Sequence, residues 1–235
     1  GCTVRGLERR DTRIEHVHFD FLGVREELEA DWVINTTPIN RLLPLVSPAI
    51  EQPARAAAER LEHVAIVFVY LEVDRPSVTP DHWIYLPEKP LRVHRVSEFQ
   101  NFSDTSSPGD RTALCCEITC RAGDATWGLS LEEAARIAVA DLVRCGLLEP
   151  GEARPLDIAR LPRAYPVYRV GYREELGQLT EGARRLDNLL STGRQGPFRY
   201  NNMDHSTALG RDAARPAGAP TDATWSLPPA HFGCA

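Results

Sequence analysis

The sequence predicts an α+β fold, in which a mixed sheet with helices is joined to a smaller α/β part. Three observations support this class. Short apolar runs such as residues 64–71 (VAIVFVYL) recur along the chain and are typical of strands. A helical pattern at residues 130–144 lies between two of these runs. Another run, residues 30–38, ends in small hydroxyl residues and Pro38, and ligands of α/β sheets bind at such carboxyl ends.

Composition indicates a globular protein and excludes several function classes. The 235 residues include 43% hydrophobic and 26% charged residues, which is enough for one large domain or two small ones. The net charge of −6 gives no basic footprint for nucleic acid, and no polybasic cluster indicates an anionic membrane surface. The longest apolar run is far below the roughly 20 residues that span a bilayer. We therefore expect neither nucleic-acid binding nor a membrane span.

The first quarter of the chain predicts a hairpin, a strand and a helix. Residues 3–22 alternate around a polar turn at 9–11, which favours a β-hairpin. The strand within residues 30–38 must stop at Pro38, because proline cannot continue a central ladder. Pro53 opens an alanine-rich helical pattern that leads into the next strand.

The middle of the chain predicts an antiparallel-looking sheet and one helix. Ser130 and Glu133 form a capping box at the start of the helix, and Gly146 ends it. Apolar residues at helical spacing give this helix a buried face. The expected strands are residues 63–73, 82–86, 91–98, 112–120 and 165–170.

The C-terminal part predicts two helices around a glycine-containing segment. One helix is expected at about 173–187 and another near Asn202, with Asn202 or Asp204 as its N-cap. Between them, Gly193 and Gly196 would let the backbone approach a ligand, and the free N–H groups of the following helix could meet an electron-rich group. An ordinary glycine turn before a capped helix fits the same pattern. The composition of residues 213–235 predicts a flexible tail.

Cysteines and histidines predict no metal centre and no hydrolase triad. The cysteines form no C-x-x-C pair with a second pair at zinc spacing, and Cys116 and Cys120 share a strand face with Ile118, where thiols usually pack. We expect reduced cysteines and a cytoplasmic location. The histidines are scattered, and only His205 lies in a segment expected to approach a ligand.

Three segments resemble a known family of flavoenzymes. Residues 193–204, which include Gly193-Arg-Gln-Gly, Phe198-Arg-Tyr and Asn202-Met-Asp, look like the C-terminal flavin-contacting motif of protoporphyrinogen-oxidase-like and amine-oxidase-like proteins and of UDP-galactopyranose mutase. Residues 31–38 are similar to the strand that leaves the FAD domain beside the isoalloxazine ring. Residues 164–168, Ala-Tyr-Pro-Val-Tyr, are similar to the strand that runs back toward the flavin. The resemblance covers roughly residues 1–212.

The resemblance implies an FAD cofactor and a role for each matching residue. Thr36, Thr37 and Pro38 would flank the flavin ring, and Gly193 and Arg194 would approach the pyrophosphate or ribityl region. Asn202, Met203 and Asp204 would present the helix N-terminus beneath the pyrimidine end, with His205 nearby. Tyr165 and Tyr168 could line a cavity for a small-molecule substrate, although their spacing allows one of them to be core. No catalytic side chain is assigned.

The resemblance also implies a division of the chain into parts. Residues 1–38 would be a partial FAD-binding domain, 39–62 a helical connection, 63–172 the substrate domain, 173–212 the C-terminal FAD-binding segment and 213–235 the flexible tail. The dinucleotide-binding pattern G-x-G-x-x-G does not occur in the sequence, and no methionine opens it. We therefore expect a piece of a longer flavoprotein. Lys89, the single lysine, does not resemble the lysine of amine oxidases.

Three functions stay open on the sequence alone. The first is a fragment of an FAD-dependent oxidoreductase. The second is a sugar-nucleotide isomerase of the UDP-galactopyranose mutase type, for which two of Arg92, Arg95 and Arg169 would clamp a diphosphate. The third is a non-catalytic truncated remnant. The substrate, the electron acceptor and the oligomeric state do not follow from the sequence.

Overall fold

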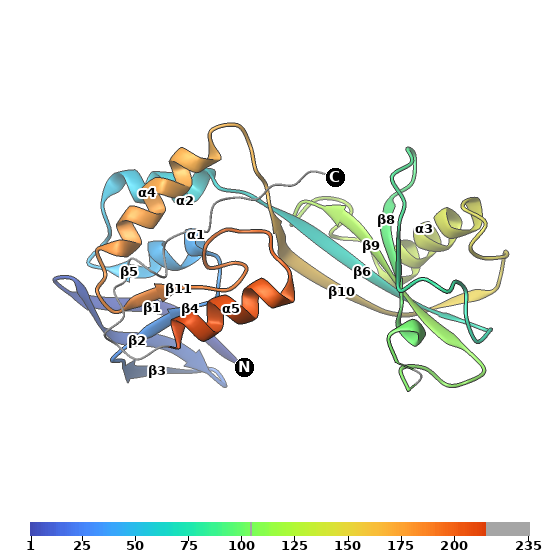
Figure 1. Ribbon diagram of the computed structural model, residues 1–235, viewed down its shortest axis with the longest axis horizontal. Helices are drawn as coiled ribbons and strands as arrows, with labels where there is room; N and C mark the ends of the chain where they lie inside the picture. Colours follow the sequence, from blue (N-terminus) through green and yellow to red (C-terminus); the bar gives the residue numbers. More distant parts are fainter. Residues whose placement is uncertain (104, 215–235) are drawn as a thin grey trace. The chain divides into compact units, whose positions relative to one another are not determined.

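A computed structural model describes residues 1–103 and 105–214 and divides them into two compact units. Unit 1 consists of Gly1–Glu62 together with residues 166–214, and unit 2 is His63–Tyr165. Figure 1 shows both units coloured along the sequence. The expected flexible tail lies outside the described residues from residue 215 on, and α5 (Met203–Ala213) occupies its first position.

Unit 1 contains two sheets. The larger has the strand order β3-β2-β1-β5, with antiparallel β1–β2 and β2–β3 pairs and a parallel β1–β5 pair. The smaller is the parallel pair β11-β4. The strands are β1 (Cys2–Arg10), β2 (Arg13–Phe21), β3 (Val24–Glu29), β4 (Val33–Asn35), β5 (Val46–Ser47) and β11 (Leu189–Ser191). The helices are α1 (Ile39–Leu42), η1 (Leu43–Leu45), α2 (Gln52–Arg60), α4 (Tyr172–Arg184) and α5.

The N-terminal hairpin and the proline-led helix are confirmed. Arg10 pairs with Arg13 across a turn in which Asp11 has a φ of 52°, so β1 and β2 form the expected hairpin. Pro53 lies in the first turn of α2, where its missing N–H leaves no helical bond unmade. Strand β3 was not predicted, because all six of its residues are exposed and four of them are charged. Such a strand shows no hydrophobic period.

Close packing of α2 on α4 organises the core of unit 1. Ala54, Ala57 and Ala58 are buried on α2, and Leu179 and Ala183 are buried on α4. A Cβ at Gly182 would lie 3.0 Å from the Cβ of Ala54, so the helices approach too closely for a larger residue. The surrounding core takes its remaining buried residues from β1, β2, α1, η1, β5, β11, the segment 192–201 and the connecting residues Ile50, Leu61 and Leu186.

Unit 2 is a five-stranded sheet of order β10-β6-β9-β8-β7 with one helix against it (Figure 1). Its elements are β6 (His63–Val73), β7 (Trp83–Tyr85), β8 (Val93–Glu98), η2 (Phe99–Asn101), β9 (Thr112–Cys120), α3 (Leu131–Arg144) and β10 (Ala153–Pro166). Strands β6 and β9 have the predicted bounds and pair antiparallel from Ala65–Cys120 to Val73–Thr112. Cys116 and Ile118 are buried in the core that α3 covers, and Cys120 packs against it, as expected from their shared face.

The prediction of a strand at residues 165–170 is wrong. Strand β10 runs earlier, over Ala153–Pro166, and the chain leaves the sheet after Pro166. Val167 donates its N–H to the carbonyl of Glu62 at 2.9 Å, and Gly171 follows with a φ of 89° at the start of α4. The large residues at 165–168 alternate as in a strand, which led to the wrong prediction. The actual strand, β10, contains several charged residues that obscure its hydrophobic pattern.

The helix of unit 2 begins as predicted. Ser130 accepts a bond from the Glu133 N–H, and the Glu133 carboxylate accepts one from the Ser130 N–H. Its buried face consists of Ala134, Ala135, Ala138, Asp141 and Leu142. Asp141 is 7% exposed and accepts bonds from the Arg92 N–H at 2.6 Å and the Val93 N–H at 2.9 Å, so α3 also holds the start of β8. No helix among the described residues is long and apolar enough to cross a membrane.

Candidate functional site

Strands β4 and β11 bring two of the three singled-out segments side by side. Leu189, Leu190 and Ser191 pair in parallel with Val33, Ile34 and Asn35. The pairing continues by one bond past the strands, because the Thr192 N–H donates to the Asn35 carbonyl at 2.8 Å. The carboxyl ends of both strands therefore lie together, with residues 36–38 after one and residues 192–194 after the other. Ligands bind at such edges of parallel sheets.

Asn35 holds the turn after β4. Its Oδ1 accepts bonds from the Thr37 N–H at 2.9 Å and from the Thr37 hydroxyl at 2.7 Å. Its Nδ2 donates to the Thr37 carbonyl and to the Ser191 Oγ, both at 2.9 Å. The Asn35 side chain is buried, whereas Thr36 and Thr37 are exposed. A buried carboxamide thus fixes two exposed threonines at the sheet edge.

The two glycines after β11 have different requirements. Gly193 has a φ of 74°, which disfavours any residue with a Cβ, although the space around it is open. A Cβ at Gly196 would lie 2.3 Å from the Thr192 carbonyl oxygen and 2.9 Å from that of Asn35. Gly196 therefore packs directly on the backbone that joins the two strands. Only glycine fits there.

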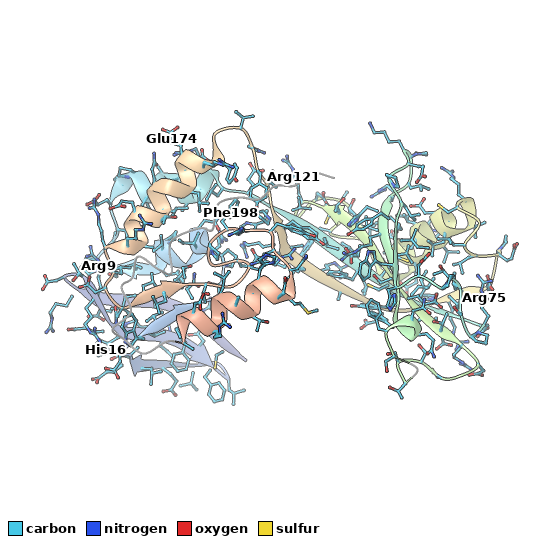
Figure 2. All side chains as sticks on the ribbon, viewed as in Figure 1. Arg9, His16, Arg75, Arg121, Glu174 and Phe198 are labelled. Atoms are coloured by element: carbon cyan, nitrogen blue, oxygen red, sulfur yellow. The ribbon has the colours of Figure 1, made fainter. Side chains whose placement is uncertain are left out.

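We call residues 192–201 the glycine loop. Its side chains make contacts within the loop. Arg194 donates from its NH1 to the Asn201 carbonyl at 2.6 Å, and its guanidinium lies 4.4 Å from the centroid of the Tyr200 ring. Phe198, labelled in Figure 2, is 1% exposed and has a φ of 52°. A buried aromatic anchor and an internal arginine bond thus hold the loop together.

Helix α5 begins directly after this loop. Asn202 is at the N-cap position, but its side chain accepts no capping bond. Met203 is 86% exposed, so the start of the helix is open to solvent. A bond from the His205 N–H lowers the pKa of Asp204, whose carboxylate also lies 3.1 Å from the His205 Nδ1. The first turn of α5 thus carries an ionised carboxylate as well as backbone donors.

The two tyrosines predicted to line a cavity belong to different units. Tyr165 ends unit 2 on β10, and Tyr168 lies in unit 1. The Tyr168 hydroxyl accepts a bond from the Tyr200 N–H at 2.6 Å, and its ring lies 6.3 Å from that of Phe198. Burial raises the pKa of Tyr168. Tyr168 therefore supports the glycine loop, a role that its distance in sequence did not indicate.

Unit 2 carries a buried ion pair on the sheet face opposite α3. Glu117 is 3% exposed and accepts a bond from the Arg95 Nε at 2.9 Å and another from its NH2. The irregularity between Val93 and Arg95 in β8 brings His94 to the same carboxylate, with its Nε2 at 3.5 Å. Burial lowers the pKa of His94. Burial alone would also lower the pKa of Arg95, but the bond to Glu117 raises it.

The three arginines expected to clamp a diphosphate each have a partner. Arg95 is held by Glu117, and the Tyr85 ring lies 5.8 Å from its guanidinium. Arg169 pairs with Glu62 at 2.6 Å in unit 1, and Arg92 donates to the Thr126 hydroxyl at 2.7 Å. Lys89 lies in the loop between β7 and β8.

The family model described as flavin containing amine oxidoreductase matches residues 1–197. Among solved structures, reduced UDP-galactopyranose mutase is similar with a TM-score of 0.74 at 21% identity, over 90% of this chain and 44% of that one. A putative protoporphyrinogen oxidase from Exiguobacterium sp. 255-15 gives 0.56 at 21% identity, over 80% and 40%. Wild-type putrescine oxidase bound to putrescine gives 0.57 at 18% identity, over 91% and 47%. No curated protein matches the chain.

Proposed function

The chain belongs to the flavin containing amine oxidoreductase family, and from that premise we propose that it supplies the flavin-ring contacts and the substrate domain of an FAD-dependent oxidoreductase. The chain spans less than half the length of the structures that it resembles. Those structures, at 21% identity or less, support the fold. The activity therefore rests on the family and on the site.

One observation carries this proposal. Residues 36–38 and 192–194 are more than 150 positions apart in the sequence, yet the bond from Thr192 to Asn35 joins them at one sheet edge. These are two of the three segments for which the sequence implies contact with a flavin. Their convergence at the carboxyl ends of two parallel strands is the arrangement that a cofactor site requires.

The residues at this edge fit the ring side of a flavin. Gly196 occupies a cradle, which is the space bounded by the backbone of Thr192 and Asn35 that a Cβ would fill. The glycine loop therefore packs directly against the ends of the strands. Thr36 and Thr37 expose their side chains there, and α5 begins without a side-chain cap. Backbone donors at a helix start stabilise negative charge. We assign Thr36, Thr37, Pro38, Gly193, Arg194 and residues 202–205 to flavin binding.

The flavin, when bound, supplies the redox chemistry by accepting two electrons from the substrate. The chain's own residues bind and orient. Asn35 and the glycine loop would hold the backbone that binds the flavin, and the first turn of α5 would supply donors to it. Tyr165 and Tyr168 remain the proposed substrate residues. A small-molecule substrate follows from the family. The electron acceptor stays open.

Mutase activity is the second candidate function, and it is less well supported because two of the three arginines that could clamp a diphosphate already pair with carboxylates. A diphosphate clamp needs guanidinium groups that can give their donors to phosphate oxygens. Arg95 already gives Nε and NH2 to Glu117, and Arg169 gives NH2 to Glu62. Recruiting them would leave a carboxylate without its partner, and for the buried Glu117 this is costly.

The missing dinucleotide pattern leads to the proposal that another segment completes the FAD site. Parallel sheets normally have several strands and are covered on both faces. The pair β11-β4 has two strands, and Ile34 within it is 51% exposed. We propose that a further segment of the whole protein adds strands there and binds the adenosine half of FAD.

Titration of the purified chain with FAD, FMN and lumiflavin tests the proposal. Contacts to the flavin ring alone should bind all three flavins. FAD should bind no more than about threefold tighter than FMN, because the chain offers few contacts to the adenosine. Quenching of flavin fluorescence gives the affinities. Gly196→Ala, which disturbs the cradle, should weaken all three together.

Three results would count against parts of the proposal. A chain that stays colourless at high flavin concentration favours the non-catalytic remnant. FAD binding at least a hundredfold tighter than FMN would contradict the absence of adenosine contacts. If UDP-galactose binds to the reduced chain and Arg95→Lys weakens that binding, the result would support mutase activity instead.

A further inference from the structure

Asn201 is the last residue of the glycine loop, two positions before α5 begins, and is 7% exposed. Its polar groups reach three places. The carbonyl accepts the Arg194 NH1 bond at 2.6 Å, Nδ2 donates to the Gly193 carbonyl at 3.4 Å, and Oδ1 accepts from the Ser206 hydroxyl at 3.0 Å. One buried residue therefore ties the beginning of the loop to the first turn of the helix.

We propose that Asn201 is a positioning residue for the flavin, which fixes the first turn of α5 relative to the carboxyl end of β11. This inference rests on the proposed function. The bonds form a continuous path, because the Thr192 N–H is held by Asn35 and Asn35 also holds Thr37. These bonds link the exposed threonines to the helix start.

The position of the helix start relative to the flavin matters, because a helix start stabilises negative charge only over a short range. The field of the backbone donors falls off within the first turn, and a donor acts best within about 3 Å of the developing charge. Asn202 does not cap the helix, and Asn201 reaches the first turn through the Ser206 hydroxyl, so Asn201 helps to hold that turn in place. Loosening Asn201 should weaken the reduced flavin more than the oxidised one.

Potentiometry of the FAD-loaded chain tests this role with Asn201→Ala and Ser206→Ala. Asn201→Ala should weaken the reduced flavin about tenfold relative to the oxidised flavin, which lowers a two-electron midpoint potential by about 30 mV. Ser206→Ala removes one of the bonds and should shift the potential in the same direction by less.

Asn40→Ala is the matched control in the same unit. Asn40 is 5% exposed, and its Nδ2 donates to the carbonyls of Leu61 at 2.9 Å and Ala58 at 3.3 Å. It should lower the melting temperature about as much as Asn201→Ala does and leave the potential unchanged. Equal shifts in all three variants, or none in Asn201→Ala, would overturn the proposal.

Amide hydrogen exchange separates this inference from the proposed function. The Arg199 N–H bonds to the Arg194 carbonyl at 3.0 Å, and the Ser206 N–H bonds to that of Asn202 at 3.1 Å. Both should exchange at least about tenfold faster in flavin-free Asn201→Ala, and not in Asn40→Ala. If the chain binds no flavin, the proposed function fails, and unchanged exchange at both amides would still refute the role of Asn201.

Discussion

At the scale of residues, buried asparagines hold unit 1 together, and two of them lie at the candidate site. Asn35 holds a turn, Asn201 holds a loop to a helix, and Asn188 ties three segments. Asn188 is completely buried, accepts the Ile14 N–H at 2.9 Å, and donates to the Ile14 carbonyl at 2.8 Å and the Asp31 carbonyl at 3.2 Å. A carboxamide can imitate a peptide group, so each of these residues extends the backbone network where no strand continues.

Glycine substitutions in the same unit should have opposite signs. Gly196→Ala places a Cβ 2.3 Å from a carbonyl oxygen, so the loop must shift and stability should fall by about 2 kcal/mol or more. Gly210→Ala, within α5, meets nothing within 4 Å and should stabilise by up to about 1 kcal/mol. Urea denaturation gives both values. Equal effects would mean that the cradle at Gly196 is not rigid.

Cys115 should make the chain sensitive to alkaline pH. Burial raises the pKa of its thiol from the ordinary value of 9.0 to about 12. Because the folded pKa lies above the unfolded one, this contribution is fully present below pH 9 and is lost as the pH rises toward 12, by at most about 1.4 kcal/mol per pH unit.

The comparison that isolates this thiol is wild type against Cys115→Ala. Their difference in unfolding free energy should be constant up to pH 9 and should then change in favour of the variant. Denaturant titrations at pH 8, 9, 10 and 10.5 measure it. A difference that does not change over this range would show that Cys115 ionises as easily in the folded chain as in the unfolded one.

At the scale of elements, α3 contributes more through its link to the sheet than through its cap. Asp141→Ala would leave the Arg92 and Val93 N–H groups without their acceptor, which should cost about 3 kcal/mol. Ser130→Ala removes one exposed capping bond and should cost about 1 kcal/mol. Chemical denaturation compares the two variants. The reverse order would mean that water replaces the Asp141 carboxylate.

Elements with a strong local signal could be predicted from the sequence, and those without one could not. The capping box of α3, the proline of α2 and the apolar run of β6 each act within a few residues, and all three are present. Strand β3 and most of β10 are exposed and charged, so their pairing depends on neighbours far along the chain. Their absence from the sequence prediction follows from that dependence.

The candidate site was predictable only where glycine, threonine and proline mark it. The resemblance covers residues 31–38, 164–168 and 193–204, which include Asn35 and Tyr168, but the bonds that join Asn35 to Ser191 and Tyr168 to Tyr200 span more than 30 positions. An asparagine at the end of a strand looks like any turn residue until its partner strand is known. These roles required the structure.

At the scale of the whole molecule, unit 2 is inserted into unit 1. Unit 1 is made of two separate stretches, whereas unit 2 is the continuous stretch His63–Tyr165. Glu62 and Val167, which flank the insertion, are joined by a bond of 2.9 Å. An insertion whose ends lie this close costs its host little chain entropy.

Unit 2 should therefore fold by itself as residues 63–165. It has about 100 residues, the commonest size of a domain, and a core of its own in which Val67, Leu114 and Leu142 are completely buried. Circular dichroism should show a single cooperative transition. Leu142→Ala should destabilise the isolated unit and the full chain by the same amount, about 3 kcal/mol, because its contacts all lie within this core. An isolated unit that binds a hydrophobic dye and melts gradually would show that its fold depends on the surrounding chain. Unit 2 would then be inserted in the order of the chain without being able to fold by itself.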